Sequence, residues 1–117
     1  MTNMTNWRGY WEQRGWGRQP MRNLTLEFAG GIVRWQGVDC IGRFTFEGTC
    51  DAQGVVAMVK QYLGRHQVLY QGQFDGEGTI FGRWSIRPFD SGEFVLTVVR
   101  DRQASEEIEE IVPASQS

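Results

Sequence analysis

The feature that most constrains this chain is an alternation of apolar and polar residues with period two, interrupted at regular intervals by turn compositions. The alternation is clear in Leu24-Thr-Leu-Glu-Phe28 and in Phe94-Val-Leu-Thr-Val98, and turns such as Asp75-Gly-Glu-Gly78 separate such segments. Successive side chains of a strand point to opposite faces, so the pattern predicts strands with one buried and one solvated face. Glycine and aspartate tolerate the backbone conformations of tight hairpins.

The pattern predicts eight strands, over residues 7–13, 21–29, 31–38, 42–50, 55–62, 67–74, 79–87 and 93–100. The inward phase is open for residues 31–38 and for residues 55–62, where either Met58 or Val59 could face inward. No long helix is predicted before residue 100, which disfavours a parallel sheet with its long crossovers. Short connections favour an all-β, eight-stranded antiparallel up-and-down barrel over a sandwich, because closure removes the sheet edges.

This barrel is expected to span residues 7–100, after a flexible N-terminus (residues 1–6) and before an acidic tail (residues 101–117) that is disordered or a short helix. Glycines 48, 72 and 82 fall on the inward face, where glycine permits the sharp coiling of a small barrel and leaves room in the lumen.

Composition narrows the classes of function. Residues 1–100 carry 11 basic and 9 acidic side chains, too balanced a charge for a typical nucleic-acid binder. No apolar run is long enough to span a membrane and no signal peptide is evident, so we expect a cytoplasmic protein. Cys40 precedes and Cys50 ends the predicted strand over residues 42–50, and two cysteines joined by one extended strand are too far apart to pair. With one histidine they are also too few for a zinc site. We expect no metal and no cofactor.

The first predicted strand carries Gly9-Tyr-Trp11, and the last ends in Val98-Val-Arg100. These two short segments resemble those of the calycins, the superfamily of lipocalins, fatty-acid-binding proteins and avidins. The resemblance implies that Trp11 closes one end of the barrel and that Arg100, or failing that Arg102, packs across the indole ring. A guanidinium on an indole face contributes about 0.5–2 kcal/mol. Gly9, Trp11 and Arg100 would then be structural residues.

The compact eight-stranded layout is most similar to the avidins, yet the biotin-binding pattern is not met. That family follows the Gly-x-Trp with an asparagine and then a Gly-Ser that bind the ureido group. Here Gln13 stands for the asparagine and Trp16 for the serine, and an indole in that place would fill space and remove an acceptor. We therefore expect a calycin-like barrel that does not bind biotin.

Aromatic side chains dominate the predicted interior, which is either a solid core or a pocket for one small ligand. The predicted inward aromatics are Trp11, Phe28, Phe44, Phe46, Tyr70, Trp84 and Phe94. The lumen residues proposed to bind a ligand are Phe46, Met58, Lys60, Tyr62, Tyr70 and Trp84.

Lys60, Tyr62, His66 and Tyr70 could bind a carboxylate or phosphate at the barrel mouth if the Met58 phase holds. The alternative is a lysine that extends outward and a histidine in an exposed loop, since an unpaired buried ammonium is costly. Asp39 lies in a turn and is expected to bond its own backbone, with an ion pair to Lys60 as the alternative.

The basic segment Arg14-Gly-Trp-Gly-Arg-Gln-Pro-Met-Arg22 either stacks on single-stranded bases or forms a long, exposed first hairpin loop, and we expect the loop. None of the predicted inward positions is acidic and no nucleophile–base set is evident, so we expect no enzyme activity. The sequence thus favours a non-catalytic barrel that binds a small, partly apolar molecule in its lumen. The alternative is a solid-cored barrel that forms homo-oligomers or binds partners through exposed residues such as Trp35, Phe81, Val95 and Val99.

Overall fold

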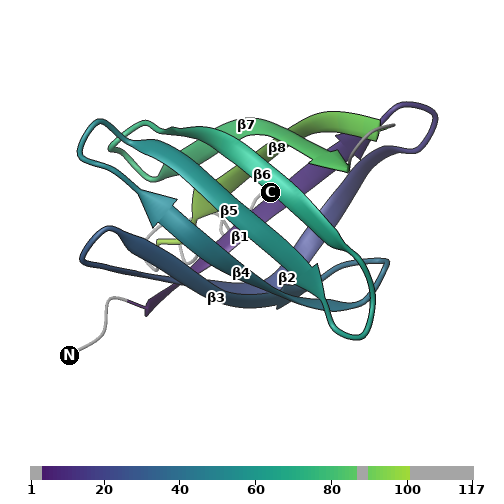
Figure 1. The fold of residues 1–117 in the computed structure, drawn as a ribbon, viewed down its shortest axis with the longest axis horizontal. Coiled ribbons are helices and arrows are strands. Elements are labelled where there is room, and N and C mark those ends of the chain that lie inside the picture. The colour runs from purple at the N-terminus through teal and green to yellow at the C-terminus, as the bar shows by residue number, and fades with distance from the viewer. Residues whose placement is uncertain (1–3, 87–89, 101–117) are drawn as a thin grey trace, which may run out of the picture.

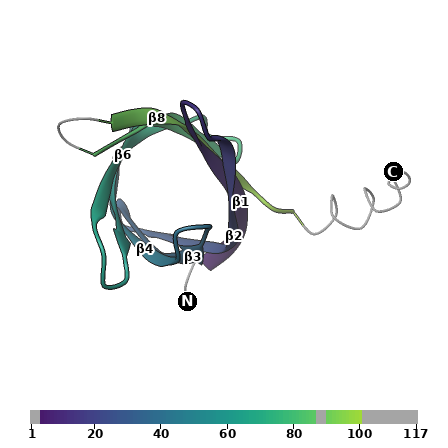
Figure 2. The same ribbon diagram turned by 90° about the vertical axis from the view of Figure 1, so that its right-hand side faces the viewer.

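The computed structural model describes residues 4–86 and 90–100 as a closed antiparallel barrel in which each strand pairs with the next and the last with the first (Figure 1). The eight strands are β1 (Met4–Gln13), β2 (Gly17–Ala29), β3 (Ile32–Val38), β4 (Arg43–Cys50), β5 (Val55–Tyr62), β6 (Gln67–Phe74), β7 (Thr79–Ile86) and β8 (Asp90–Val98). Figure 2 shows these strands arranged around a ring. The predicted fold class and meander order are confirmed.

Most strand boundaries agree with the prediction to within one residue, and the differences concern the first two strands and the last. β1 begins at Met4 rather than residue 7, β2 begins at Gly17 rather than residue 21, and β8 spans Asp90–Val98 rather than 93–100. The predicted acidic tail, residues 101–117, lies outside the described residues, as does Arg102.

The inward phase of β3 and β5 is settled by burial. Val33 and Gly37 face the interior from β3, and in β5 the inward set is Val56, Met58, Lys60 and Tyr62. Trp35 shares the phase of Val33, but its φ is 149° and its side chain remains 36% exposed.

A bulge in β2 turns one more side chain inward than strict alternation along a strand predicts. Asn23 has a φ of 51°, and the pairing of β2 with β3 shifts between Arg22 and Thr25. Asparagine tolerates this left-handed conformation better than most residues. The bulge brings both Met21 and Leu24, three residues apart, to the interior.

The three inward glycines allow neighbouring strands to approach, and they do not leave room for a ligand. Gly72 on β6 pairs directly with Gly82 on β7. A Cβ on Gly82 would meet the carbonyl oxygen of Gln71, and one on Gly48 would meet that of Ala57. The space predicted beside these glycines is therefore occupied by backbone, which corrects that part of the sequence prediction.

Buried aromatic side chains fill most of the barrel. Phe44, Phe46, Tyr70 and Phe94 form a chain of ring contacts through its middle, with centroids 4.6–5.3 Å apart. At the end of the barrel where β1 begins, the half-buried ring of Phe28 packs on Trp7 at 5.8 Å and on Phe74 at 6.0 Å. The opposite end, where β1 and β5 finish, carries the candidate site.

Candidate functional site

Asp39 lies in the connection between β3 and β4 and turns its carboxylate into the barrel, with 3% of the residue exposed. Its Oδ1 accepts hydrogen bonds from the backbone N–H groups of Ile41 at 2.9 Å and Gly42 at 3.4 Å. This is the local turn bonding that the sequence predicts for aspartate. Because Oδ1 is occupied by the turn, Oδ2 is left facing the interior.

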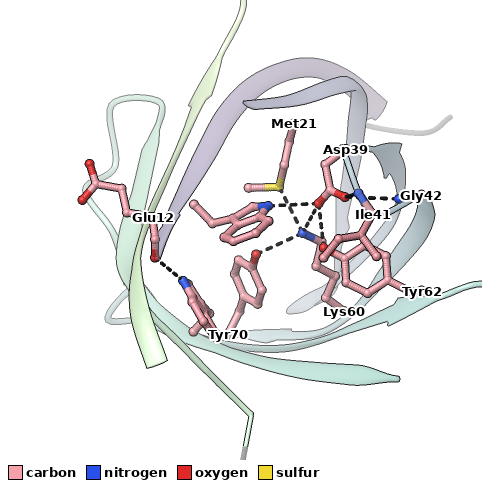
Figure 3. Close-up of polar contacts among 10 residues, drawn as sticks. Glu12, Met21, Asp39, Ile41, Gly42, Lys60, Tyr62 and Tyr70 are labelled. Atoms are coloured by element: carbon pink, nitrogen blue, oxygen red, sulfur yellow. Dashed lines mark hydrogen bonds and ion pairs between the residues drawn. The ribbon is translucent and has the colours of Figure 1, made fainter. Parts of the chain in front are cut away.

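Three inward side chains donate hydrogen bonds to this single oxygen (Figure 3). Lys60 Nζ and Tyr62 Oη each lie 2.7 Å from Asp39 Oδ2, and Trp11 Nε1 lies 3.0 Å away. Both predictions for Asp39, the turn and the ion pair with Lys60, hold at once. The expectation that no acidic side chain faces inward is wrong, because the turn carries Asp39 into the lumen.

Lys60 is fully buried and does not extend outward. Besides Asp39, its ammonium donates to Tyr70 Oη at 3.1 Å and approaches Met21 Sδ at 3.7 Å. Aromatic rings surround it: Nζ lies 4.2 Å from the ring centroid of Phe44, 4.8 Å from that of Tyr62 and 5.2 Å from that of Tyr70. The ammonium is thus stabilised by a carboxylate and by the negative faces of aromatic rings.

Burial and pairing shift the pKa values of this cluster in opposite directions. Burial lowers the pKa of Lys60 to about 8, although Asp39 opposes the shift. Burial would raise the pKa of Asp39, but the charge of Lys60 and the hydrogen bonds from Lys60 and Tyr62 hold it below its ordinary value. Burial raises the pKa values of Tyr62 and Tyr70, so both hydroxyls stay protonated.

The Tyr70 hydroxyl has an unused hydrogen-bonding capacity. Its oxygen accepts from Lys60, and the described residues contain no acceptor for its own proton. Tyr70 is only 1% exposed, and an unpaired buried donor costs about 1–3 kcal/mol. A ligand or water with a hydrogen-bond acceptor would satisfy this group.

A small cavity of about 40 Å³ lies at this end of the barrel, the barrel mouth, beside the Tyr70 side chain. Its lining consists of Trp11, Gln13, Ile41, Tyr62, His66, Val68, Tyr70, Trp84 and Ile86. This volume holds about three water molecules. Pockets that enclose a drug-sized ligand measure about 300 Å³ or more, so the lumen itself is largely filled.

The predicted lumen residues divide between this mouth cavity and the core beneath it. Tyr62, Tyr70 and Trp84 line the cavity, whereas Lys60 lies directly behind Tyr70. Phe46 and Met58 are each 1% exposed and are absent from the cavity lining, so they form core.

His66 lies at the rim in the turn between β5 and β6, as the sequence suggests. Its ring centroid is 5.1 Å from that of Tyr62, and it lines the mouth cavity although it is exposed. Trp84 donates its Nε1 hydrogen to the Glu12 carbonyl oxygen at 2.9 Å and packs edge-on against Trp11. The rim is therefore aromatic, and hydrogen bonds hold the indoles of Trp11 and Trp84 in place.

The structure separates Trp11 from Arg100, which corrects the packing implied by the calycin resemblance. Trp11 pairs with Phe94, whereas Arg100 follows Val98, which pairs with Trp7 at the other end of β1. Arg100 donates to the Glu77 carbonyl oxygen at 2.8 Å, and Lys60 is the cation over the Trp11 ring, at 5.7 Å.

Gly9 is required for close strand packing. A Cβ there would lie 2.6 Å from the carbonyl oxygen of Val95 on β8 and 2.5 Å from a Leu96 methyl.

The basic segment is a long loop only in the prediction: residues 17–22 belong to β2 and Met21 is buried, so only residues 14–16 form the turn of the β1–β2 hairpin, which projects from the barrel (Figure 1). Trp16 is 61% exposed at its tip, so its indole does not fill the barrel, contrary to the comparison with the biotin pattern. Arg18 pairs with Glu12 at 2.7 Å and stacks 4.2 Å above the Tyr10 ring. Gln13 contributes to the mouth cavity.

Cys40 is exposed and Cys50 half-buried, and both thiols are free. Residues 4–86 and 90–100 contain no group of three or more histidine, cysteine, aspartate or glutamate side chains placed to hold a metal ion. The same residues include no helix of the length and apolar character needed to cross a membrane.

The closed eight-stranded meander is compatible with a calycin-like fold. Comparisons of the chain with protein-family models, with curated proteins and with solved structures give no match. The class of the molecule is thus defined by its structure as a compact all-β barrel with a buried aromatic cluster.

Proposed function

We propose that this protein is a non-catalytic, calycin-like binding module whose ligand enters the mouth cavity. The ligand is small and partly apolar, and it places a hydrogen-bond acceptor against the Tyr70 hydroxyl. The observation that carries this proposal is the buried Tyr70 O–H group, which lines the cavity and lacks an acceptor among the described residues.

The chemistry of the cavity wall supports a flat molecule. Trp11, Tyr62, Tyr70 and Trp84 present aromatic surface, while Ile41, Val68 and Ile86 add aliphatic surface. Small-molecule sites are usually lined by apolar side chains with a few polar groups among them. Because the cavity measures about 40 Å³, it receives one end of the ligand and leaves the rest at the rim near His66.

The two free thiols support a location in a reducing compartment such as the cytoplasm. This location is part of the proposal, as is the absence of catalysis.

Binding is tested by NMR titration of the labelled protein with benzamide, a flat probe that carries a carbonyl acceptor. The chain has five tryptophans, whose indole N–H signals report on separate places. We expect the signals of Trp11 and Trp84 to move and that of the exposed Trp16 to stay, because only the first two line the cavity. Equal movement of all five, or none at millimolar probe, would contradict the proposal.

Adjacent residues on β6 provide a matched control. Val68 lines the cavity, whereas its neighbour Leu69 is 37% exposed on the outer face. Val68→Phe fills the cavity and should abolish the benzamide response. Leu69→Phe introduces the same side chain on the outer face and should leave the benzamide response intact.

A second candidate function is association through the outer wall, supported by a row of apolar side chains. Exposed Phe81 on β7 pairs with half-buried Val95 on β8, which pairs in turn with Tyr10 on β1. Trp35 lies on β3, away from this row, and Val99 is half-buried just beyond β8, so the four predicted residues do not form one patch.

Sedimentation of the wild type and of Phe81→Ser at matched concentrations tests this candidate. A defined oligomer that the substitution dissociates would favour association through the wall. A monomer in both samples would exclude self-association through the wall.

A further inference from the structure

Three exposed arginines on the outer wall of the barrel have no acidic partner among residues 4–86 and 90–100. They are Arg8 on β1, Arg22 on β2 and Arg43 on β4. By contrast, the exposed arginines at positions 18, 34 and 83, which also lie on strands, each form an ion pair with a glutamate. The outer wall thus carries three cations whose charge is not neutralised within the described part of the chain.

These three arginines form a row across neighbouring strands, the arginine row. Arg8 lies opposite Arg22 at the irregularity in the pairing of β1 with β2. Val38 on β3 pairs with Arg22 on one side and with Arg43 on the other. Like charges that face each other on adjacent strands destabilise a sheet, so the row favours an anionic partner.

A groove of about 260 Å³ lies beside this row on the outer wall, and we call it the wall groove. Val38 and Leu63 give it apolar surface, and Leu63 is 55% exposed. No acidic side chain of the described residues lines it. Four polar side chains in its lining lack a hydrogen-bond partner within the described part of the chain: Asn23, Gln36, Arg43 and Thr45. The groove therefore suits a segment that carries both acidic and apolar side chains.

The chain itself contains such a segment. Residues 106–112, the acidic segment, read Glu-Glu-Ile-Glu-Glu-Ile-Val, and residues 101–117 together carry five acidic and one basic side chain. We propose that the acidic segment binds in the wall groove, with its glutamates beside the arginine row and its apolar side chains against Val38 and Leu63. The groove is thereby an interaction surface whose occupant is the carboxyl-terminal part of the same chain.

The last described residues lie close enough for this contact. The Val99 N–H donates to the Asn6 carbonyl oxygen at 2.8 Å, and Asn6 on β1 pairs with Thr25 on β2, which pairs with Gln36 on β3. Three strand spacings, about 15 Å, therefore separate Val99 from Gln36. The chain from residue 99 to residue 106 covers about 23 Å when extended, at ~3.3 Å per residue. The acidic segment thus reaches the groove over the outer surface.

Tethering compensates for the weakness of exposed ion pairs. Such pairs are individually weak and are screened by salt. A segment on the same chain is present at an effective concentration in the millimolar range, so several weak contacts are enough to populate the bound state. The contact should therefore be intramolecular and sensitive to salt.

The test compares NMR spectra of the labelled full-length protein with those of a variant whose tail glutamates are neutral, Glu106→Gln/Glu107→Gln/Glu109→Gln/Glu110→Gln. The side-chain amide signals of Asn23 and Gln36 report on the groove, and that of Gln71, exposed on β6, is the reference. At low salt we expect the two groove signals to differ between the proteins and the reference to coincide. In about 1 M salt, where the Debye length is roughly 3 Å, the difference should vanish. Identical groove signals at low salt would overturn the proposal.

A pair of arginine substitutions separates the groove from the net charge of the barrel. Arg43→Gln removes a cation that lines the groove, whereas Arg14→Gln removes one from the exposed β1–β2 turn. Arg43→Gln should move the backbone amide signals of residues 106–112 toward their positions at high salt, and Arg14→Gln should leave them in place. Equal responses to the two substitutions would show that the tail follows only net charge, which contradicts binding in the groove.

Dilution distinguishes the chain's own tail from that of a second copy. Binding within one chain does not depend on protein concentration, whereas binding between copies does. Differences at Asn23 and Gln36 that persist on dilution support the proposal, and differences that disappear would assign the tail to a second copy and overturn it. The wall groove and the mouth cavity share no lining residue, so this inference stands apart from the proposed function.

Discussion

Removal of the Asp39 carboxylate tests whether the stability of the barrel depends on an ion-pair partner for the buried Lys60 ammonium. Asp39→Ala leaves the fully buried Lys60 ammonium without a counter-charge and takes the acceptor from Tyr62 Oη and Trp11 Nε1. Breaking one side of a buried pair costs about 3–5 kcal/mol. We therefore expect the free energy of unfolding to fall by about 4 kcal/mol, and the melting temperature by roughly 15–30 °C for a domain of this size.

The matched variant replaces both charges. In Lys60→Met/Asp39→Asn no charge remains to be desolvated, and the amide oxygen can still accept from Tyr62 and Trp11. Such replacements are often neutral or stabilising, so the double variant should lie within about 1 kcal/mol of the wild type. Together with the single variants Lys60→Met and Asp39→Asn, the double variant completes a cycle whose non-additivity measures the coupling between the two charges.

Urea denaturation at pH 7, followed by tryptophan fluorescence, gives these free energies. Glu12→Ala is the control, because it breaks the exposed Glu12–Arg18 pair and should cost less than about 1 kcal/mol. If Asp39→Ala costs no more than Glu12→Ala, the Lys60–Asp39 pair is not desolvated and the reasoning is refuted.

Three further predictions concern the indoles, the glycines and pH. Trp11→Ala should destabilise the barrel by about 3–5 kcal/mol, since Trp11 is 4% exposed, whereas Trp16→Ala at the hairpin tip should change it by less than about 0.5 kcal/mol in the same urea assay. Gly82→Ala should lower the free energy of unfolding by about 1–3 kcal/mol, because the new methyl meets the Gln71 carbonyl oxygen. This loss is measured as a lower thermal midpoint. The free energy of unfolding of the wild type, relative to that of the Lys60→Met/Asp39→Asn variant, should rise by up to about 3 kcal/mol between pH 8 and pH 10.5. In this pH range the unfolded chain still holds a proton on Lys60, whereas the folded chain has released it.

Each of these predictions has a contrary outcome. Equal effects of the two tryptophan substitutions would place Trp11 outside the core. An unchanged midpoint for Gly82→Ala would mean that β6 and β7 do not approach as closely as described. A stability difference that stays flat from pH 8 to pH 10.5 would show that burial does not lower the Lys60 pKa.

Much of this architecture follows from local sequence alone. The alternation that places Phe44 and Phe46 inward, and the turn compositions between strands, both act over a few residues, so they predict the strands and their order. The same alternation places Lys60, Tyr62 and Tyr70 together on inward faces once the Met58 phase is chosen. A lone lysine in such a phase is a signal that a buried acid must lie nearby.

The bulge in β2 and the pairing register of β1 with β8 cannot be predicted from local alternation. Met21 faces inward only because Asn23 interrupts β2, and alternation counted back from Leu24 places Met21 on the outside. The distance between Trp11 and Arg100 depends on the pairing of β1 with β8, which joins residues far apart in the chain. Matching a motif by order along the chain therefore predicted a contact that the register does not allow.

By itself the sequence determined the all-β class, the eight strands in meander order and most of the inward aromatic residues, Trp7 excepted, because these follow from the period of side chains along a strand. Only the tertiary structure decided that Asp39 enters the lumen, that Oδ2 gathers three donors and that about 40 Å³ remains open at the mouth. Cavity volume is the small remainder after many side chains from all strands have packed. That remainder depends on the relative placement of every strand, which no local pattern contains.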